Sequence, residues 1–426
     1  MTTRPRRVAV IGGIRIPFCR AYTAYALHSN QDMMTAALRG LVEKFALHGE
    51  VLGDVGLGAV IKHSRDYNLA RECTLSSGLS AKTPAFDIQR ACGTSLSAAI
   101  AIGAKISQGL IDAGIAGGVD TISDMPIVYP DSYRRILLDS ARGRSFLGKL
   151  RPWVRLRPRD FRPEFPAVVE PRTGLSMGES MEITAKRWQI SRTEQDELAL
   201  QSHLNAAAAW AEGFYGDLVI EYAGVKQDNN IRADSSLEAL ARLKPAFDRT
   251  EAGTLTAGNS TPLTDGASAV LLASEKWALE RNLPILCYLT HAREAAVDFV
   301  NDEGLLMAPA YAVSDMLKAA AVSLQDFDLY EIHEAFAAQT IATLKAWESP
   351  EFCKDRLFRN EPMGSIDRSR LNRKGGSVAL GHPFAATGTR ILATLAKQLG
   401  ERDGGRGLIS VCTAGGMGVT AILERN

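Results

Sequence analysis

The spacing of apolar residues along the chain predicts alternating strands and helices. Short apolar runs of strand length occur in both the first and the last third, with longer amphipathic segments between them. We expect strands at 7–12, 57–61, 85–88, 114–119, 285–290, 327–332, 407–412 and 417–423. We expect helices at 31–48, 94–108, 178–188, 193–212, 311–321, 335–347 and 387–399. Strands that alternate with helices are typical of α/β architecture. The middle of the chain, from about 126 to 250, differs because it is rich in Pro and Arg up to Pro171.

Two segments far apart in the chain share one pattern of small-residue turn, apolar helix, strand and Gly-Gly. The first runs from Ala91-Cys-Gly-Thr-Ser to Gly117-Gly118, and the second from Gly381-His-Pro-Phe to Gly415-Gly416. An internal duplication would produce this echo, although any doubly wound protein repeats the same unit. If the halves are duplicated, two helix N-termini meet and bring Cys92 and His382 together.

Composition and charge exclude several classes of protein. The 426 residues carry 49 Lys and Arg against 48 Asp and Glu, a net charge of +1, which argues against a nucleic-acid-binding protein. No stretch approaches about 18 uninterrupted apolar residues, so we expect no transmembrane helix. The first residues do not read as an export signal, and the six cysteines form no Cys-x-x-Cys pair. We therefore expect reduced thiols in a cytoplasmic protein.

Cys92 stands at the start of an apolar helix, in Arg90-Ala-Cys-Gly-Thr-Ser. Backbone N–H groups and the positive end of the helix dipole stabilise a thiolate there, so we expect a lowered thiol pKa. The small neighbouring residues would let a substrate approach the sulfur. Taken alone, Cys92 is more typical of an inert buried cysteine than of a nucleophile.

Two further segments near the C-terminus carry candidate chemistry. His382 lies between Gly381 and Pro383, where it would either act as a base towards a thiol or satisfy the turn. Cys412 follows a buried strand, at the end where α/β sheets bind ligands, although alone it is typical of a core residue. The glycines after it lack the order of a dinucleotide-binding loop. No second His or acid stands at metal-ligand spacing near His382, so we expect no metal site.

Three more segments place polar or pocket-forming residues. His333 follows an apolar strand, which is an active-site position in α/β sheets but also one for simple helix capping. The loop from Gly258 to Ala269 is polar and contains Asn259, whose side chain can fix it by local hydrogen bonds. Met177 opens a helix and would line an apolar tunnel or belong to the core.

Taken together, these segments resemble the thiolase family over nearly the whole chain. The resemblance rests on motifs in the family's order: Arg15-Ile-Pro-Phe, Cys92-Gly-Thr-Ser, Met177-Gly178, Gly258 to Ala269, His333-Glu-Ala-Phe, Gly381-His382-Pro383 and Cys412 to Gly416. It implies an α/β thiolase fold of two duplicated βαβαβαββ halves that form a five-layered αβαβα core. The N-terminal half would hold 1–125 and 253–280, the inserted loop domain 126–252, and the C-terminal half 281–426.

The resemblance also assigns roles to these residues. Cys92 would attack the C3 carbonyl of a 3-ketoacyl-CoA, His382 would take its proton, and Cys412 would protonate the departing acetyl-CoA enolate. One oxyanion site would use His382 and a water held by His333, and the other the backbone N–H groups of Cys92 and Ala414. No cofactor would be tightly bound, because coenzyme A is a substrate. The expected CoA and pocket contacts are Arg232, Thr261, Met177, Phe336 and Asn259.

Two departures from the family pattern bear on function. Many thiolases have Asn where this chain has His333, and His-Glu-Ala-Phe resembles thiolase subunits of fatty-acid β-oxidation multienzyme complexes. The segments 142–172 and 228–232 resemble the same subgroup. The nucleophile motif reads Cys-Gly-Thr-Ser rather than Cys-Gly-Ser-Gly, which leaves the acyl-chain preference open. We expect a degradative 3-ketoacyl-CoA thiolase, and the alternatives are a biosynthetic acetoacetyl-CoA thiolase and a non-catalytic scaffold subunit.

One segment concentrates positive charge. Between 142 and 162 stand eight basic residues and one acid, with Trp153, Leu156 and Phe161 among them. Basic segments with interleaved apolar residues bind anionic surfaces, and the alternative is a solvated basic loop. We expect this segment to dock on a membrane or on a hydratase/dehydrogenase α-subunit. The resemblance further implies a homodimer or homotetramer, in which N-terminal halves pair through a sheet edge.

Overall fold

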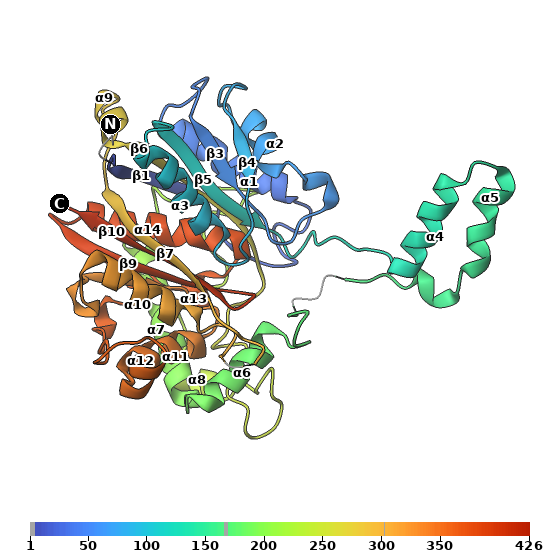
Figure 1. Cartoon of the computed structure of the whole chain (residues 1–426). Coiled ribbons are helices and arrows are strands. Elements are labelled where there is room, and N and C mark those ends of the chain that lie inside the picture. The colour runs from blue at the N-terminus through green and yellow to red at the C-terminus, as the bar shows by residue number, and fades with distance from the viewer. Residues whose placement is uncertain (1–4, 166–168, 302) are drawn as a thin grey trace.

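The computed structural model describes residues 5–165, 169–301 and 303–426. It shows a body of sheet and helices from which one lobe projects (Figure 1). Within the described residues the strands form one sheet in the order β4-β3-β5-β6-β1-β7-β10-β9-β8, and β2 pairs with β6 beside that path. The strands are β1 (Val8–Arg15), β2 (Cys19–Arg20), β3 (Asp54–Leu57), β4 (Ala85–Asp87), β5 (Ala113–Asp120), β6 (Thr264–Ser274), β7 (Cys287–Ala296), β8 (Leu329–Ile332), β9 (Gly405–Thr413) and β10 (Met417–Arg425).

The pairing of the strands repeats in the two halves of the chain. In the first half β3 pairs in parallel with β4 and β5, and β6 pairs antiparallel with β5 and β1. In the second half β8 pairs in parallel with β9 and, through one bridge from Tyr330, with Leu371. There β10 pairs antiparallel with β9 and β7. The same order of pairing in both halves confirms the duplication. The first strands of the halves, β1 and β7, join the two half-sheets antiparallel at Val10 and Cys287.

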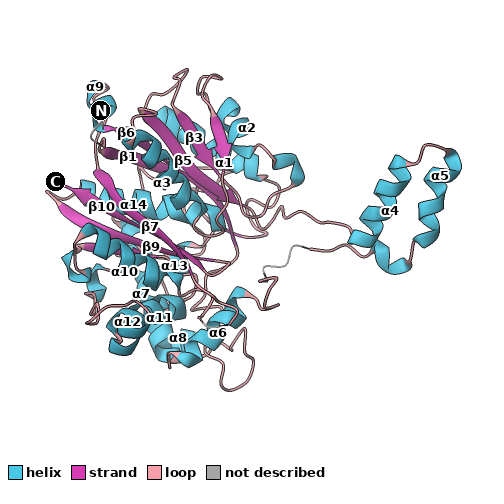
Figure 2. Ribbon diagram, in the orientation of Figure 1, coloured by secondary structure: helices cyan, strands magenta, loops and turns pink. Residues whose placement is uncertain are grey.

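The helices lie between and outside the half-sheets (Figure 2). Helices α3 and α14 pack against each other in the middle, α1 covers the outer face of β6, β1 and β5, and α10 covers β7, β10 and β9. This arrangement gives the predicted five layers. The longer helices are α1 (Asn30–Lys44), α2 (Leu69–Ser76), α3 (Thr94–Ser107), α4 (Asp131–Arg142), α6 (Met177–Arg187), α7 (Arg192–Ala211), α10 (Ala308–Ala320), α11 (Ala337–Glu348) and α14 (Thr387–Gly400). The shorter ones are α5 (Phe146–Leu150), α8 (Leu237–Ala241), α9 (Glu275–Glu280), α12 (Pro350–Asp355) and α13 (Ser377–Leu380).

The central pair of helices approaches unusually closely where both begin. A Cβ atom on Gly388 would lie 2.4 Å from the backbone N of Leu96, so only glycine fits there. The backbone N–H of Thr389 donates to the Ser95 hydroxyl at 2.9 Å. Because Cys92 lies two residues before α3 and His382 five residues before α14, the close packing helps to fix how the two residues lie relative to each other.

The structure corrects the predicted strand at 57–61. The strand β3 is Asp54–Leu57, and the chain turns away after Leu57. The reason lies in the backbone donors: the N–H groups of Val60 and Ile61 bind the buried Asp120 carboxylate at 2.9 and 2.7 Å instead of a neighbouring strand. The apolar pattern also missed α2 and did not identify the polar-flanked run at 264–274 as β6.

Between β5 and β6 the chain leaves the sheet for the segment that we propose as an inserted domain, 126–252. Its first part forms the projecting lobe, built from α4, α5 and two short 3₁₀ turns at Arg151–Arg155 and Pro158–Phe161 (Figure 1). Its second part, from α6 to α8, packs on the C-terminal half through α11 and α13. Across the described residues, no helix combines the length and the apolar character needed to cross a membrane.

Candidate active site

Cys92 lies in a tight turn two residues before α3. The residue before it, Ala91, has a φ of +41°, and the Thr94 hydroxyl holds the turn closed. That hydroxyl accepts from the Arg90 N–H at 2.8 Å and donates to the Ala91 carbonyl at 2.7 Å. A Cβ on Gly93 would lie 2.8 Å from side-chain carbons of Thr413 and Val419, so a small residue is needed after the cysteine. The Thr of the Cys-Gly-Thr-Ser motif thus shapes the turn that presents the sulfur.

His382 is held by the turn between α13 and α14. Gly381 has a φ of +97°, in the left-handed region that favours glycine. The Nδ1 atom of His382 lies 2.6 Å from the Thr387 hydroxyl, one helical turn along the chain. The next anchor is Asp120 of the other half, whose carboxylate accepts from the Ala385 N–H at 2.7 Å. Both halves of the fold therefore position this histidine.

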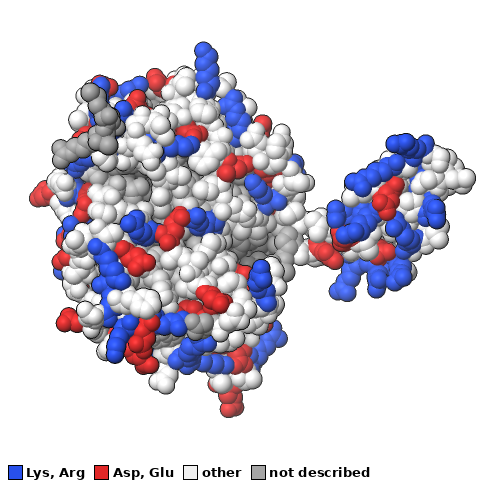
Figure 3. Space-filling model, viewed as in Figure 1, with Lys and Arg blue, Asp and Glu red and all other residues white. Residues whose placement is uncertain are grey.

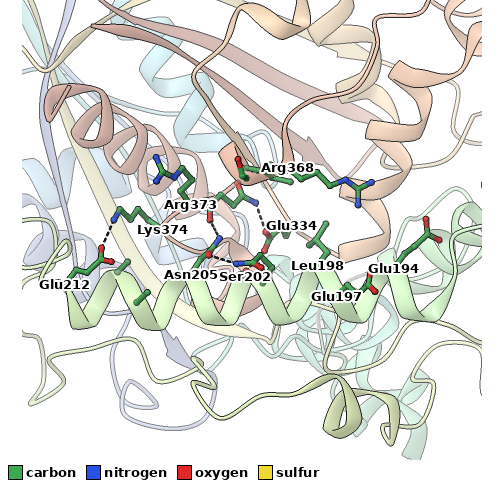
Figure 4. Close-up of a pocket in the computed structure, with 16 residues that line it drawn as sticks. Glu194, Glu197, Leu198, Ser202, Asn205, Glu212, Glu334, Arg368, Arg373 and Lys374 are labelled. Carbon is green, nitrogen blue, oxygen red and sulfur yellow. Dashed lines mark hydrogen bonds and ion pairs between the residues drawn. The ribbon is translucent and has the colours of Figure 1, made fainter. Parts of the chain in front are cut away.

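His333 follows β8 and is fully buried. Its ring centroid lies 4.1 Å from that of His382, and its Nδ1 atom lies 2.7 Å from the Ser377 hydroxyl. The next residue, Glu334, belongs to a different environment. Its carboxylate accepts from Ser202 on α7 at 2.7 Å and from Asn372 at 2.5 Å, at the floor of a groove beside α7 (Figure 4). Of these two successive residues, His333 thus contributes to the site, and Glu334 contributes to the packing of α7.

Three reactive atoms converge at one site, and we refer to their immediate surroundings as the pocket. The Cys92 sulfur and one ring nitrogen each of His333 and His382 all lie within 4.8 Å of one another. The Nε2 atoms of both histidines are buried and have no hydrogen-bond partner among the described residues. Since Nδ1 of each ring is occupied by a hydroxyl, the Nε2 atoms are free to act on a bound molecule.

Cys412 and Ala414 complete the pocket from the end of β9. The Cys412 side chain is buried; burial raises the pKa of its thiol, and the nearby Cys92 sulfur raises it further. The Ala335 backbone interacts with the Cys412 thiol by hydrogen bonding. The backbone of Ala414 does the same for the Cys92 sulfur. The backbone donor assigned by resemblance therefore stands beside the candidate nucleophile.

The electrostatics correct one expectation. Burial raises the pKa of the Cys92 thiol to about 12, although backbone hydrogen bonds from Ala414 and Cys92 itself act to lower it. Burial likewise lowers the pKa of His382 to about 3. The expected lowering of the Cys92 pKa by the helix N-terminus is wrong for this resting state, because desolvation outweighs the backbone hydrogen bonds to the sulfur. At neutral pH the pair is a thiol and a neutral imidazole.

Three of the expected CoA contacts surround one junction. The Thr261 hydroxyl and backbone N–H both donate to the Ala335 carbonyl at 3.1 Å. Phe336 is mostly buried and pairs with Ser260 by a backbone bridge. The Asn259 side chain is fully buried and bonds to Thr256 N–H, the Asp196 carboxylate and the Thr254 carbonyl. It fixes the loop, as the sequence indicated, and these bonds leave its amide little capacity for a ligand.

The other two expected contacts differ in setting. Met177 opens α6 and packs on the same hydrophobic cluster as Phe336 and Cys412, and its place in the pocket wall stays a prediction. Arg232 is exposed, and the bond that fixes it runs from its backbone N–H to His203 Nδ1 at 3.1 Å. No contact in the described residues joins Arg232 to the pocket.

The residue set could in principle hold a soft metal, because Cys92, His333 and His382 offer one sulfur and two nitrogens at close range. Spacing along the chain did not predict this, since the three residues come from three separate motifs. Metal-ligating histidines usually pass their other N–H to a carboxylate or carbonyl. Here both Nδ1 atoms contact hydroxyls, which is more typical of acid–base chemistry. The absence of a metal stays a prediction.

Several residues of the site were missed by sequence reasoning. Ser377, Thr387 and Arg390 support the two histidines, and Glu170 binds the loop that carries Ala414. Phe247 contacts Phe336 with ring centroids 5.7 Å apart. Thr387 lay within the segment Gly381-His-Pro-Phe-Ala-Ala-Thr-Gly, so a search for hydroxyls near His382 would have found it. The others come from distant parts of the chain.

Comparisons with known proteins agree along the whole chain. The family model described as "Thiolase, N-terminal domain" matches residues 8–276, and "Thiolase, C-terminal domain" matches residues 283–425. A 3-ketoacyl-CoA thiolase of Yersinia pestis (strain Pestoides F) is 41% identical over 430 residues, covering 100% of this chain and 98% of that protein. The acetyl-CoA acetyltransferase of Bacillus anthracis has a TM-score of 0.82 at 29% identity, covering 99% of this chain and 100% of its own. Human mitochondrial 3-ketoacyl-CoA thiolase in complex with CoA has a TM-score of 0.81 at 29% identity, and the match covers 99% of this chain and 98% of the human chain.

Proposed function

The chain belongs to the thiolase family and is an acyltransferase, and on that premise we propose that it is a degradative 3-ketoacyl-CoA thiolase. It would cleave 3-ketoacyl-CoA with CoA to acetyl-CoA and an acyl-CoA two carbons shorter, in fatty-acid β-oxidation. The observation that carries the proposal is the convergence of the Cys92 sulfur with His333 and His382 nitrogens within 4.8 Å. Cys412 beside Cys92 supplies a second thiol for proton transfer.

The first half-reaction would form an acyl-enzyme on Cys92. His382 Nε2 takes the thiol proton as the sulfur attacks C3, and the carbonyl oxygen becomes an oxyanion. The C2–C3 bond then breaks, and its electron pair forms the enolate of acetyl-CoA. Cys412 gives its proton to that carbon. The proton on His382 returns to the Cys412 thiolate, so the site is neutral again when acetyl-CoA leaves.

The second half-reaction would release the shortened acyl-CoA. His382 takes the proton of an incoming CoA thiol, and the CoA sulfur attacks the acyl-enzyme carbonyl. The intermediate collapses by breaking its bond to the Cys92 sulfur, which recovers the proton from His382. The N–H groups of Cys92 and Ala414 would stabilise one oxyanion, and His382 with a water held by His333 the other. Covalent catalysis in two steps predicts ping-pong kinetics.

The alternative is a biosynthetic acetoacetyl-CoA thiolase. The structural similarity to an acetyl-CoA acetyltransferase supports this alternative. An assay of thiolysis with a C16 3-ketoacyl-CoA against acetoacetyl-CoA separates the two. We expect a higher kcat/KM for the C16 substrate. Turnover restricted to acetoacetyl-CoA would favour the biosynthetic enzyme, and turnover of neither substrate would favour a scaffold subunit.

We further propose that the lobe docks on an anionic membrane surface. Figure 3 shows Lys and Arg side chains gathered over the lobe. Trp153 and Phe161 pack on Tyr133 within the lobe, with ring centroids 6.3 and 5.5 Å apart. Both remain partly exposed, and other apolar side chains of the lobe reach further into solvent: Phe146 is 76%, Leu147 77% and Val154 87% exposed. Exposed apolar residues beside Arg and Lys fit a lipid headgroup region, and an α-subunit is the competing partner.

Vesicle sedimentation tests this docking. Wild type should sediment with phosphatidylglycerol vesicles, and the double variant Phe146→Ser, Leu147→Ser should bind at least several-fold more weakly. Leu110→Ser is the matched control, because Leu110 is 69% exposed on the body. Equal binding of all three proteins would show that the lobe does not contact the membrane through these apolar side chains. An α-subunit would then be the partner to test.

The oligomeric state and the compartment remain part of the proposal. The strand β4 lies at the edge of the sheet in the N-terminal half and its side chains are half-buried, which supports pairing of two chains into a homodimer or homotetramer. The six cysteines are unpaired in the structure, which supports a reducing compartment such as the cytoplasm.

A further inference from the structure

The two histidines of the pocket share one arrangement that fixes where their protons lie. Both rings are buried, and burial lowers the pKa of each below its ordinary value, so each is neutral and carries a single N–H. In each ring Nδ1 contacts a hydroxyl, and Nε2 is buried with no hydrogen-bond partner among the described residues. Which of the two nitrogens holds the proton therefore depends on what the hydroxyl does with its own proton.

The hydroxyl next to His382 belongs to Thr387. It lies 3.2 Å from the Pro383 carbonyl, which can only accept a hydrogen bond, so the Thr387 proton points there. The same oxygen lies 2.6 Å from His382 Nδ1 and must accept from it. His382 then carries its proton on Nδ1, and Nε2 presents a lone pair to the pocket.

The hydroxyl next to His333 belongs to Ser377, and its surroundings are the reverse. The guanidinium of the buried Arg390, which can only donate, lies 3.0 Å from the Ser377 oxygen. The Ser377 proton is thus left for His333 Nδ1, at 2.7 Å. His333 then carries its proton on Nε2 and presents an N–H to the pocket. Burial lowers the pKa of Arg390, whereas the nearby Glu331 and Glu334 act to raise it.

We propose that Thr387 and the Ser377–Arg390 pair are positioning residues that hold the two adjacent histidines in opposite tautomers. His382 is set as an acceptor, able to take the proton of Cys92. His333 is set as a donor, able to hold a water or an oxyanion. The use of these tautomers in catalysis rests on the proposed thiolase function, whereas the tautomers themselves are a property of the resting protein.

The direct test is ¹⁵N NMR of the full-length protein with ¹⁵N-labelled histidine, without substrate. Protonated and unprotonated ring nitrogens resonate far apart, and the signals are assigned by their loss in His333→Asn and His382→Asn. We expect Nδ1–H with a bare Nε2 for His382, and the opposite for His333. The same tautomer at both residues, or a mixture at either, would overturn the proposal. Because no substrate is used, that result leaves the thiolase function to be tested separately.

Variants connect the tautomers with turnover. In Thr387→Val the His382 signal should become a mixture of tautomers, and the rate of Cys92 acylation should fall by roughly tenfold or more. Thr387→Ser should restore both within about threefold, since it keeps the hydroxyl. Thr394→Val is the control, because Thr394 is a buried threonine on the same helix. Ser377→Ala should disturb the His333 tautomer and leave that of His382 unchanged. A Thr387→Val protein with an unaltered His382 signal would contradict the proposed role of Thr387.

Discussion

Glu170 accepts a hydrogen bond from the backbone N–H of Gly415, with 2.6 Å between the carboxylate oxygen and the nitrogen. Glu170 is buried and lies seven residues before α6, in the segment between β5 and β6. Gly415 directly follows Ala414, whose backbone binds the Cys92 sulfur. One carboxylate of the inserted segment thus holds the loop that provides a candidate oxyanion donor.

This contact predicts that Glu170→Ala lowers kcat without unfolding the protein. A hydrogen bond to a charged group contributes about 1.5–3 kcal/mol, so a loss of roughly tenfold or more is expected if the loop shifts. Steady-state thiolysis and the urea midpoint would be measured together. Glu164→Ala is the matched control, because the side chain of Glu164 is exposed. Equal kcat values for both variants would show that the loop holds its position without the carboxylate.

His333→Ala should lose activity strongly and still fold. A donor aimed at an oxyanion is typically worth about 3–4 kcal/mol, which corresponds to a fall in kcat of roughly 10²–10³. His333→Asn should retain more activity, because its amide also donates into the pocket and many thiolases resemble that variant. Stopped assays and circular dichroism would be compared for both. Wild-type-like turnover of His333→Ala would remove His333 from the site.

The perturbed thiol pKa predicts the pH dependence of Cys92 alkylation. The pKa of Cys92 is about 12 and that of His382 about 3, so the reactive thiolate is scarce at neutral pH. A thiol titrating far above the working range gains about tenfold in thiolate for each pH unit. The rate of modification by iodoacetamide, followed by peptide mass mapping, should therefore rise steadily from about pH 6 to pH 9. A plateau across this range would indicate a preformed thiolate–imidazolium pair.

A buried ion pair joins two motifs that lie far apart in the sequence. Arg15 binds Asp228 through two hydrogen bonds of 2.5 and 2.7 Å, and both side chains are almost inaccessible. Asp228→Asn leaves the guanidinium uncompensated and should lower the free energy of unfolding by about 3–5 kcal/mol. Lys276→Ala, which breaks an exposed pair with Glu280, should cost less than about 1 kcal/mol. Urea unfolding measures both, and equal losses would contradict a structural role for the buried pair.

The sequence predicted the central elements well where the apolar pattern is long and its ends are marked. The helices expected at 94–108 and 387–399 match α3 and α14 to within one residue, since each follows a small-residue turn. The internal echo also pointed to the meeting of Cys92 and His382. The strand at 57–61 was misplaced because Asp120, about 60 residues further along the chain, takes its backbone donors. A local pattern cannot report such a bond.

The protonation states and hydrogen-bond partners of the site were harder to predict than which residues form it. The helix N-terminus before α3 suggested a lowered thiol pKa, whereas burial of the sulfur dominates and raises it. Thr413 and Val419 from the other half pack against Gly93, the residue that follows Cys92. The partners of His333 are equally distant, because Ser377 and Arg390 follow it by 44 and 57 residues. The thiol pKa and the partners of His333 depend on residues that are distant in the sequence, so a local pattern does not report them.

The central claim is that Cys92 carries the acyl group, and mass spectrometry of the trapped adduct tests it most directly. The protein would be mixed with a 3-ketoacyl-CoA in the absence of free CoA, quenched in acid and mapped by peptide. Cys92→Ala would serve as the negative control, and Cys353→Ala, which alters a buried cysteine on α12, as the matched one. We predict one acyl group, two carbons shorter than the substrate chain, on Cys92 of wild type and Cys353→Ala. An adduct on another residue, or acetyl-CoA release without any adduct, would contradict the account.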